Sequence, residues 1–157
     1  MPFLSEALTK LLSDLISTIV GYMNVFFKRG DHASCQAILN WGIGLLLGLR
    51  KEEKQNYFDK VSAVLLAALA GSQFLSGQGD KAHDTLIKAK ELAAFFDASP
   101  SYDESDIRFV TRIEGASAHD DMGATAMDAV SHVVNQFENE EFTALWKTLT
   151  EQEKHHE

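Results

Sequence analysis

The chain of 157 residues has little cysteine, little proline and few cations. Its single cysteine, Cys35, cannot form an internal disulfide, which fits a reducing compartment and predicts a cytoplasmic protein. Its two prolines are fewer than an all-β protein with many turns usually carries. Lysine and arginine total 14 against 23 aspartate and glutamate residues, a formal net charge of −9. We therefore expect no nucleic-acid or membrane partner, because binding phosphates takes clustered cations.

Long hydrophobic runs are also missing. The two most apolar stretches, 37–49 and 61–75, fall short of the roughly 20 residues that a bilayer span needs, so we expect both to be buried helices. The start of the chain does not predict a signal peptide, because it lacks a basic segment and Glu6 and Asp14 interrupt its apolar residues. Apolar residues make up 45%, enough for the core of one domain, which we place over 1–157.

Apolar residues recur at helical spacing along most of the chain, and no stretch alternates long enough to propose a sheet. The pattern predicts an all-α protein of about seven helices. We expect two long antiparallel helical hairpins over 1–96, a loop over 97–105, a C-terminal group of shorter helices over 106–152 and a tail over 153–157. The expected helices span about residues 4–28, 32–48, 52–75, 81–96, 103–114, 120–137 and 139–152.

Local signals mark several helix ends. Gly30 follows a basic pair, which is typical of a helix C-terminus, and Asp31 is well placed to cap the next helix. We expect that helix to stop at Gly48, before a second basic pair. Asp80 is the expected cap of the fourth helix, and Asp120 belongs to a candidate capping box before the sixth.

The most informative feature is an internal repeat, because residues 26–42 align with 73–89 at a shift of 47. Each copy carries an aromatic residue, then a glycine, then a returning helix with two small residues and a leucine on its inner face. Small residues at such positions let two helix axes approach closely. The matched pairs are Phe27 and Phe74, Gly30 and Gly77, Cys35 and Ala82, Leu39 and Leu86, and Gly42 and Ala89.

Over residues 19–93 this arrangement resembles the tetratricopeptide repeat. The Gly-Asp turn, the small residue five positions after the glycine, the large apolar residue four later and the small one three later look like the second half of that motif. The sequence departs from the family in its period, which is 47 instead of 34, and in lacking the Trp, Leu and Gly of the first helix and the closing proline. The resemblance implies stacked helical hairpins whose concave surface holds a peptide or a partner helix.

We therefore expect a non-enzymatic protein–protein interaction module, an adaptor or chaperone-like protein with a basic or amphipathic protein partner and no cofactor. The broad apolar face of the first helix predicts a homodimer. The aromatic residues expected to line a partner groove are Tyr22, Phe26, Phe27, Trp41 and Phe74.

Two other functions stay open: a sensor domain with a small apolar ligand between the first four helices, and a metal-dependent enzyme. His119, Asp120 and Asp121 are of metal-ligand types, but adjacent residues at a helix start point to different faces. Cys35 lies in the first turn of a helix, where the dipole lowers a thiol pKa, yet its counterpart Ala82 indicates packing. We expect no catalytic or metal site, and solvated surface positions for His32 and His83.

Overall fold

The computed structural model describes residues 6–53, 57–98 and 125–154, and these residues form six α-helices and no strand. The all-α prediction is therefore confirmed for this part of the chain. The helix expected over 103–114 lies outside the described residues. The six helices are α1 (Glu6–Lys28), α2 (His32–Glu53), α3 (Tyr57–Leu75), α4 (Gly79–Ala98), α6 (Ala126–Gln136) and α7 (Glu140–Lys154).

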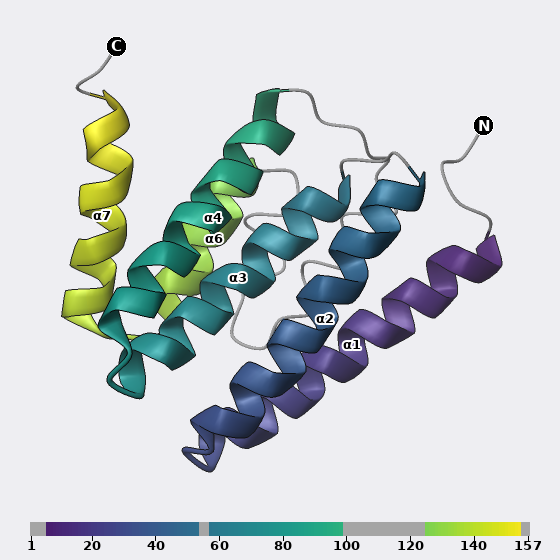
Figure 1. Ribbon diagram of the computed structural model, residues 1–157, viewed down its shortest axis with the longest axis horizontal. Coiled ribbons are helices and arrows are strands. Elements are labelled where there is room, and N and C mark those ends of the chain that lie inside the picture. Colours follow the sequence, from purple (N-terminus) through teal and green to yellow (C-terminus); the bar gives the residue numbers. More distant parts are fainter. Residues whose placement is uncertain (1–5, 54–56, 99–124, 155–157) are drawn as a thin grey trace.

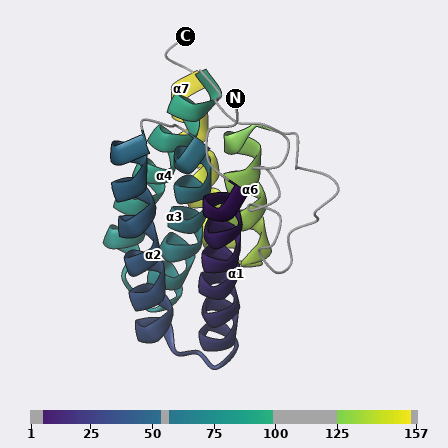
Figure 2. The same cartoon turned by 90° about the vertical axis from the view of Figure 1, so that its right-hand side faces the viewer.

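Helices α1 to α4 form a row in which each one runs antiparallel to the next and packs against it (Figure 1). Helix α6 lies against α3 and α4 on one side of this row, and α7 flanks α4 and α6. In Figure 1, α1 lies at the edge of the row opposite α7, and turning the molecule shows α1 in the foreground between α2 and α6 (Figure 2). The first hairpin therefore forms the outer end of the molecule.

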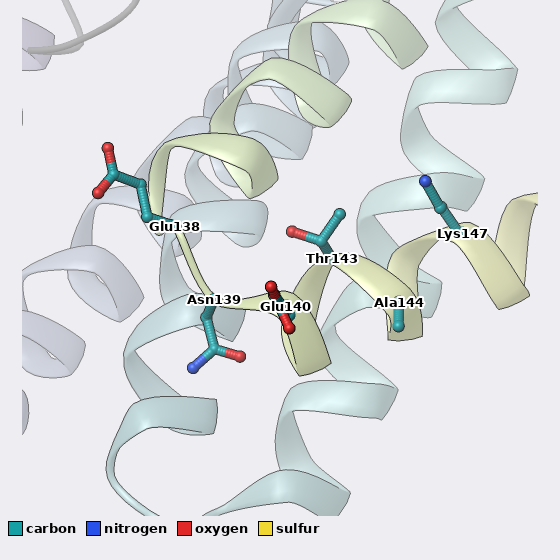
Figure 3. Close-up of a pocket in the computed structure, with 6 residues that line it drawn as sticks. All are labelled: Glu138, Asn139, Glu140, Thr143, Ala144 and Lys147. Carbon is teal, nitrogen blue, oxygen red and sulfur yellow. The ribbon is translucent and has the colours of Figure 1, made fainter.

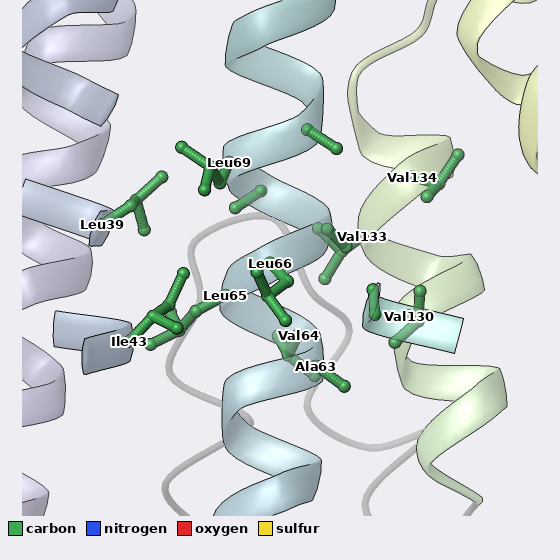
Figure 4. Packing of buried hydrophobic residues seen from close by; sticks show 14 of the residues in the cluster. Leu39, Ile43, Ala63, Val64, Leu65, Leu66, Leu69, Val130, Val133 and Val134 are labelled. Atoms are coloured by element: carbon green, nitrogen blue, oxygen red, sulfur yellow. The ribbon is translucent and has the colours of Figure 1, made fainter. Parts of the chain in front are cut away.

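Helix α3 is the centre of the core because it packs against α2, α4 and α6. Every residue from 59 to 73 is buried, as expected of a helix that is apolar on all sides. The predicted burial of 61–75 is confirmed up to residue 73, and Leu75 is 40% exposed. Figure 4 shows leucines of α3 facing Leu39 and Ile43 of α2, with Val130, Val133 and Val134 of α6 across the helix.

The two sharp turns have the same backbone geometry. Gly30 adopts φ of 70°, its amide bonds the Phe27 carbonyl at 3.0 Å, and the Asp31 amide bonds the Phe26 carbonyl at 2.9 Å. This pair of bonds is a Schellman motif, which requires a residue with positive φ after the helix end. Forty-seven residues later Gly77 has φ of 85° and donates to Phe74 at 3.2 Å, while Gln78 donates to Gln73 at 2.8 Å.

The matched inner positions of the two returning helices are all buried: Cys35 and Ala82, Leu39 and Leu86, and Gly42 and Ala89. One helix earlier the correspondence is partial, because Ile19 and Met23 are buried like their counterparts Leu66 and Ala70 but the third pair differs. Tyr22 is 54% exposed whereas its counterpart Leu69 is 4% exposed, because α1 lies at the edge of the row and α3 at its centre.

Several helix ends differ from the prediction. Helix α2 continues through Gly48 to Glu53, and α3 begins at Tyr57. A glycine ends a helix when it takes the left-handed conformation, and among the described glycines only Gly30 and Gly77 do so. Asp31 caps α2 as expected, accepting from the Ser34 amide at 3.1 Å.

The polar residues at the end of α4 and the start of α6 also correct the prediction. Asp80 lies in the first turn of α4 instead of preceding it, and Asp97, expected in a loop, belongs to the last turn of this helix. Its carboxylate accepts from the amides of Ala126 and Met127 at 2.7 and 3.1 Å. With Thr125 as the N-cap, helix α6 begins at residue 126, and not near 120.

Candidate functional site

The five aromatic residues expected to line a partner groove divide into two groups. Phe27 and Phe74 make ring contacts with the C-terminal helices. Tyr22 and Trp41 are 54% and 55% exposed, and the half-buried Phe26 stacks on Tyr22 with centroids 6.1 Å apart. The first group belongs to an inner cluster and the second to an outer face.

The inner cluster consists of Phe27, Phe74, Phe137 and Phe142. Phe27 lies 5.2 Å from Phe137, which lies 5.4 Å from Phe142, and Phe142 in turn lies 5.4 Å from Phe74. Phe137 is the C-cap residue of α6 and Phe142 lies in the first turn of α7. The α6–α7 turn thus joins the C-terminal ends of α1 and α3, and rings of this chain already contact the aromatic positions of the predicted groove.

The outer face is the side of the α1–α2 hairpin directed away from the core. Among the residues whose side chains the structure describes, seven large apolar side chains are exposed, and five of them belong to this hairpin. The concentration is notable because single exposed apolar residues are ordinary, whereas a group on one face marks an interaction site. The outer face comprises Leu11, Leu15, Tyr22, Val25 and Phe26 of α1 and Ala37, Ile38, Trp41, Gly44, Leu45 and Gly48 of α2.

The two stripes lie on the same side of the hairpin. The seam between the helices passes through Ile19 and Gly42, since a β-carbon on Gly42 would lie 2.6 Å from the Cδ1 atom of Ile19. Tyr22 lies three residues after Ile19, and Trp41 and Leu45 lie one before and three after Gly42. Helical geometry therefore places these exposed side chains beside the seam, opposite the buried stripes that face the core.

The outer face also lacks formal charge. Residues 15–27 and 33–49 contain no Asp, Glu, Lys or Arg, although the whole chain carries a net charge of −9. The charged residues Asp14 and Lys28 stand at the limits of the α1 segment. A partner that approaches this face meets apolar surface instead of the acidic surface typical of the chain.

This face corrects the expectation that 37–49 is a buried helix. Trp41 and Leu45 are 55% and 37% exposed, and Gly44 and Gly48 are also exposed. Helix α2 is covered by α1 on one side and by α3 on another, and no other described helix packs closely against it. Composition could not reveal this, because the stripe that faces outward also lacks formal charge and carries large apolar residues such as Ile38, Trp41 and Leu45.

A polar group lies where α2 begins and α3 ends. The Nδ1 atom of His32 lies 3.3 Å from the Ser72 hydroxyl, and Gln36 donates to Ser76 at 3.1 Å. His32 is half-buried, so its expected solvated position is wrong, whereas His83 is exposed as expected.

Burial raises the pKa of the Cys35 thiol, and a hydrogen bond with Ser72 opposes this effect. A buried, neutral thiol fits the packing role predicted for Cys35.

The N-terminal part of α3 buries two charged residues, Asp59 and Lys60. The Lys60 ammonium lies 5.7 Å from the centroid of the Phe96 ring. Burial lowers the Lys60 pKa, and the Asp97 carboxylate opposes this effect. Because Asp97 also caps α6, these residues tie three helices together.

A shallow depression of about 410 Å³ lies at the α6–α7 turn. Five of the six residues that line it have polar or charged side chains, and Figure 3 shows Asn139 and Glu140 at the turn with Thr143 and Lys147 along α7. In the part of the chain that the structure describes, no three His, Cys, Asp or Glu residues are arranged to hold a metal ion. His119, Asp120 and Asp121 lie outside the described residues.

Comparison with known proteins gives no assignment: no family model, curated protein or solved structure matches the chain. Within the described residues, none of the helices combines the length and apolar content that a membrane span requires. The outer face is therefore the feature that carries the functional argument.

Proposed function

We propose that this protein is a non-enzymatic protein–protein interaction module built from two related helical hairpins, with the outer face of α1 and α2 as its docking surface. The observation that carries the proposal is the exposure of Leu11, Tyr22, Val25, Trp41 and Leu45 on one face, which carries no formal charge over 15–27 and 33–49. Aromatic residues that are exposed within an apolar patch are typical anchors of protein interfaces.

The relation between the hairpins is supported by their turns and by their inner positions. Equivalent backbone hydrogen bonds occur at a shift of 47 residues, and Gly30 and Gly77 both have positive φ. In each copy the small residue five positions after the glycine is fully buried. These features favour two copies of one helical-hairpin unit, as the resemblance to the tetratricopeptide repeat implies.

The proposal moves the docking surface from the expected groove to the outer face. Phe27 and Phe74 contact Phe137 and Phe142 of the same chain, so a peptide would have to displace the α6–α7 turn to reach them. Trp41 needs no such displacement, because it is already 55% exposed. The partner that fits is a protein surface with a complementary apolar stripe, such as one side of an amphipathic helix.

A charge placed at Trp41 tests the proposal. The tagged full chain serves as bait in its native cells, beside Trp41→Glu and Phe95→Glu. Phe95 on α4 is a matched control, because its exposed fraction is also 55%. We expect the same identified polypeptides with the wild type and Phe95→Glu, and their loss with Trp41→Glu. Equal recovery by all three baits, or no specific recovery, would contradict the proposal, provided that circular dichroism shows all three folded.

A further inference from the structure

We infer that the occupant of the outer face is a second copy of this chain, paired through a twofold axis that packs α2 against α2. The inference rests on the proposed function, since it names the partner of the same surface. Three observations carry it: the distribution of charge, the self-complementary shape of the α2 stripe, and the area of the hairpin.

The charge distribution favours self-association through this face. Two copies with a net charge of −9 each repel one another, and the repulsion is strongest where acidic surfaces approach. The outer face is bounded by charges but carries none over 15–27 and 33–49. Two copies that meet here bury no carboxylate at the centre of the contact and keep their acidic residues at its rim or outside it.

The α2 stripe has a projection and a hollow at matching positions. Trp41 projects from it, and Gly44 and Gly48 follow on the same side. A β-carbon on either glycine would meet nothing within 4 Å, so the hollow is open. A twofold axis between residues 43 and 44 places Trp41 of each copy opposite these glycines of the other. Such reciprocal contact is what an isologous dimer requires.

The size of the hairpin is also sufficient. Helix α1 has 23 residues and α2 has 22, so each is about 33 Å long at 1.5 Å per residue. Two packed helices present a face about 20 Å wide, which gives roughly 650 Å² for each copy over the full length of the hairpin. The uncharged segments 15–27 and 33–49 form the centre of this face, and the charged helix ends form its rim. Specific interfaces bury about 600–1,000 Å² for each partner.

The two tryptophans allow a direct test. Trp41 lies at the centre of the proposed contact, whereas Trp146 is buried and donates from Nε1 to the Ser131 hydroxyl at 2.8 Å. Subtracting the fluorescence emission spectrum of Trp41→Phe from that of the wild type gives the emission of Trp41. When the protein is concentrated, we expect this difference spectrum to shift to shorter wavelength and acrylamide to quench it less. Acrylamide is neutral, so the negative charge of the protein does not bias the result.

Sedimentation velocity over the same concentrations gives the mass. We expect the wild type and Phe95→Glu to dimerise, Trp41→Glu to stay monomeric, and Trp41→Ala to dimerise at least about tenfold more weakly. Added salt should tighten the dimer, because it screens the repulsion between two acidic chains. Salt that weakens the dimer would overturn the inference.

Three further results would also overturn the inference: a wild type that is monomeric at every concentration, a Trp41→Glu variant that dimerises like the wild type, and a Trp41 shielded from acrylamide in the monomer. The proposed function fails separately. If the protein is monomeric but Trp41→Glu still abolishes the binding of an identified partner, the proposed docking surface stands and only the second copy is ruled out. If there is neither a dimer nor a partner whose binding depends on Trp41, both proposals are wrong.

Discussion

The ring of Phe137 lies directly against Gly71, so close that a β-carbon on residue 71 would overlap three of its atoms. Gly71 is buried in the central helix α3, and Phe137 is the C-cap residue of α6. Because Gly71 has no side chain, the ring of Phe137 can pack directly against the backbone of α3, and the α6–α7 turn docks there. The same ring touches Phe27 and Phe142, so this contact holds together the inner cluster.

Gly71→Ala should consequently destabilise the fold. Overpacking costs about 1–3 kcal/mol, and the gain in helix propensity offsets about 1 kcal/mol of it. Urea unfolding should show a net loss of up to about 2 kcal/mol. Gly21→Ala is the control, since Gly21 is exposed in α1 and a β-carbon added there would have nothing within 4 Å. It should gain up to about 1 kcal/mol, and similar stability of the two variants would contradict the packing argument.

The turn glycines should be sensitive for a different reason. Gly30 and Gly77 have φ of 70° and 85°, and a β-carbon added to either would have no atom within 4 Å. Replacing either by alanine should lower the free energy of unfolding by about 1–2 kcal/mol through backbone strain alone. Asparagine, which tolerates this conformation better, should cost less at both positions. Gly79→Ala, at the first residue of α4 and without positive φ, should stay near the wild type in thermal unfolding.

The Cys35 thiol should be unreactive in the folded protein. It is 1% exposed, and burial raises its pKa, so little thiolate forms near neutral pH. Alkylation by a maleimide should proceed only as fast as the protein opens, and it should become rapid in denaturant. Rapid reaction of the native chain, at the rate of a free cysteine, would show that the packing role is wrong.

The stability of the fold should depend on Lys60 at alkaline pH. Burial lowers the Lys60 pKa in the folded state below the ordinary value of 10.5, so the unfolded chain holds this proton to higher pH than the folded chain. The contribution of Lys60 to the free energy of unfolding therefore becomes more stabilising as the pH rises from the lowered pKa to 10.5.

Lys60→Met removes this contribution, and both proteins keep Cys35 and the other residues that titrate in this pH range. Chemical denaturation over this pH range should show the wild type gaining stability relative to the variant. A constant difference between the two would mean that Lys60 titrates as a solvated lysine does.

Much of the fold follows from local sequence. The period of the apolar residues predicted the helices, and Gly30 with Asp31 marked one turn correctly because glycine after a helix end accepts positive φ and aspartate caps the next helix. Burial of Cys35, Leu39 and their counterparts was also predicted, from the alignment of 26–42 with 73–89, and is confirmed. The end of α2 was misplaced because Gly48 can be tolerated inside a helix, and its sequence signal resembles that of a true stop.

The candidate site could be predicted only in part. Tyr22, Phe26 and Trp41 were predicted to line a partner groove together with Phe27 and Phe74, whereas in the structure they lie on the outer face. Phe27 and Phe74 belong instead to the inner cluster, because Phe137 and Phe142 reach them from helices more than sixty residues away along the chain. No local pattern encodes such a contact.

The sequence by itself determined that this chain forms helices, where two of its turns fall and which small residues lie inward, because these depend on backbone conformation and helical period. Only the tertiary structure decided which apolar stripes are covered. Helix α3 lies between α2, α4 and α6 and is buried on all sides, whereas α2, which is less apolar than α3, has described neighbours on two sides. Its position near the end of the row therefore left Trp41 at the surface.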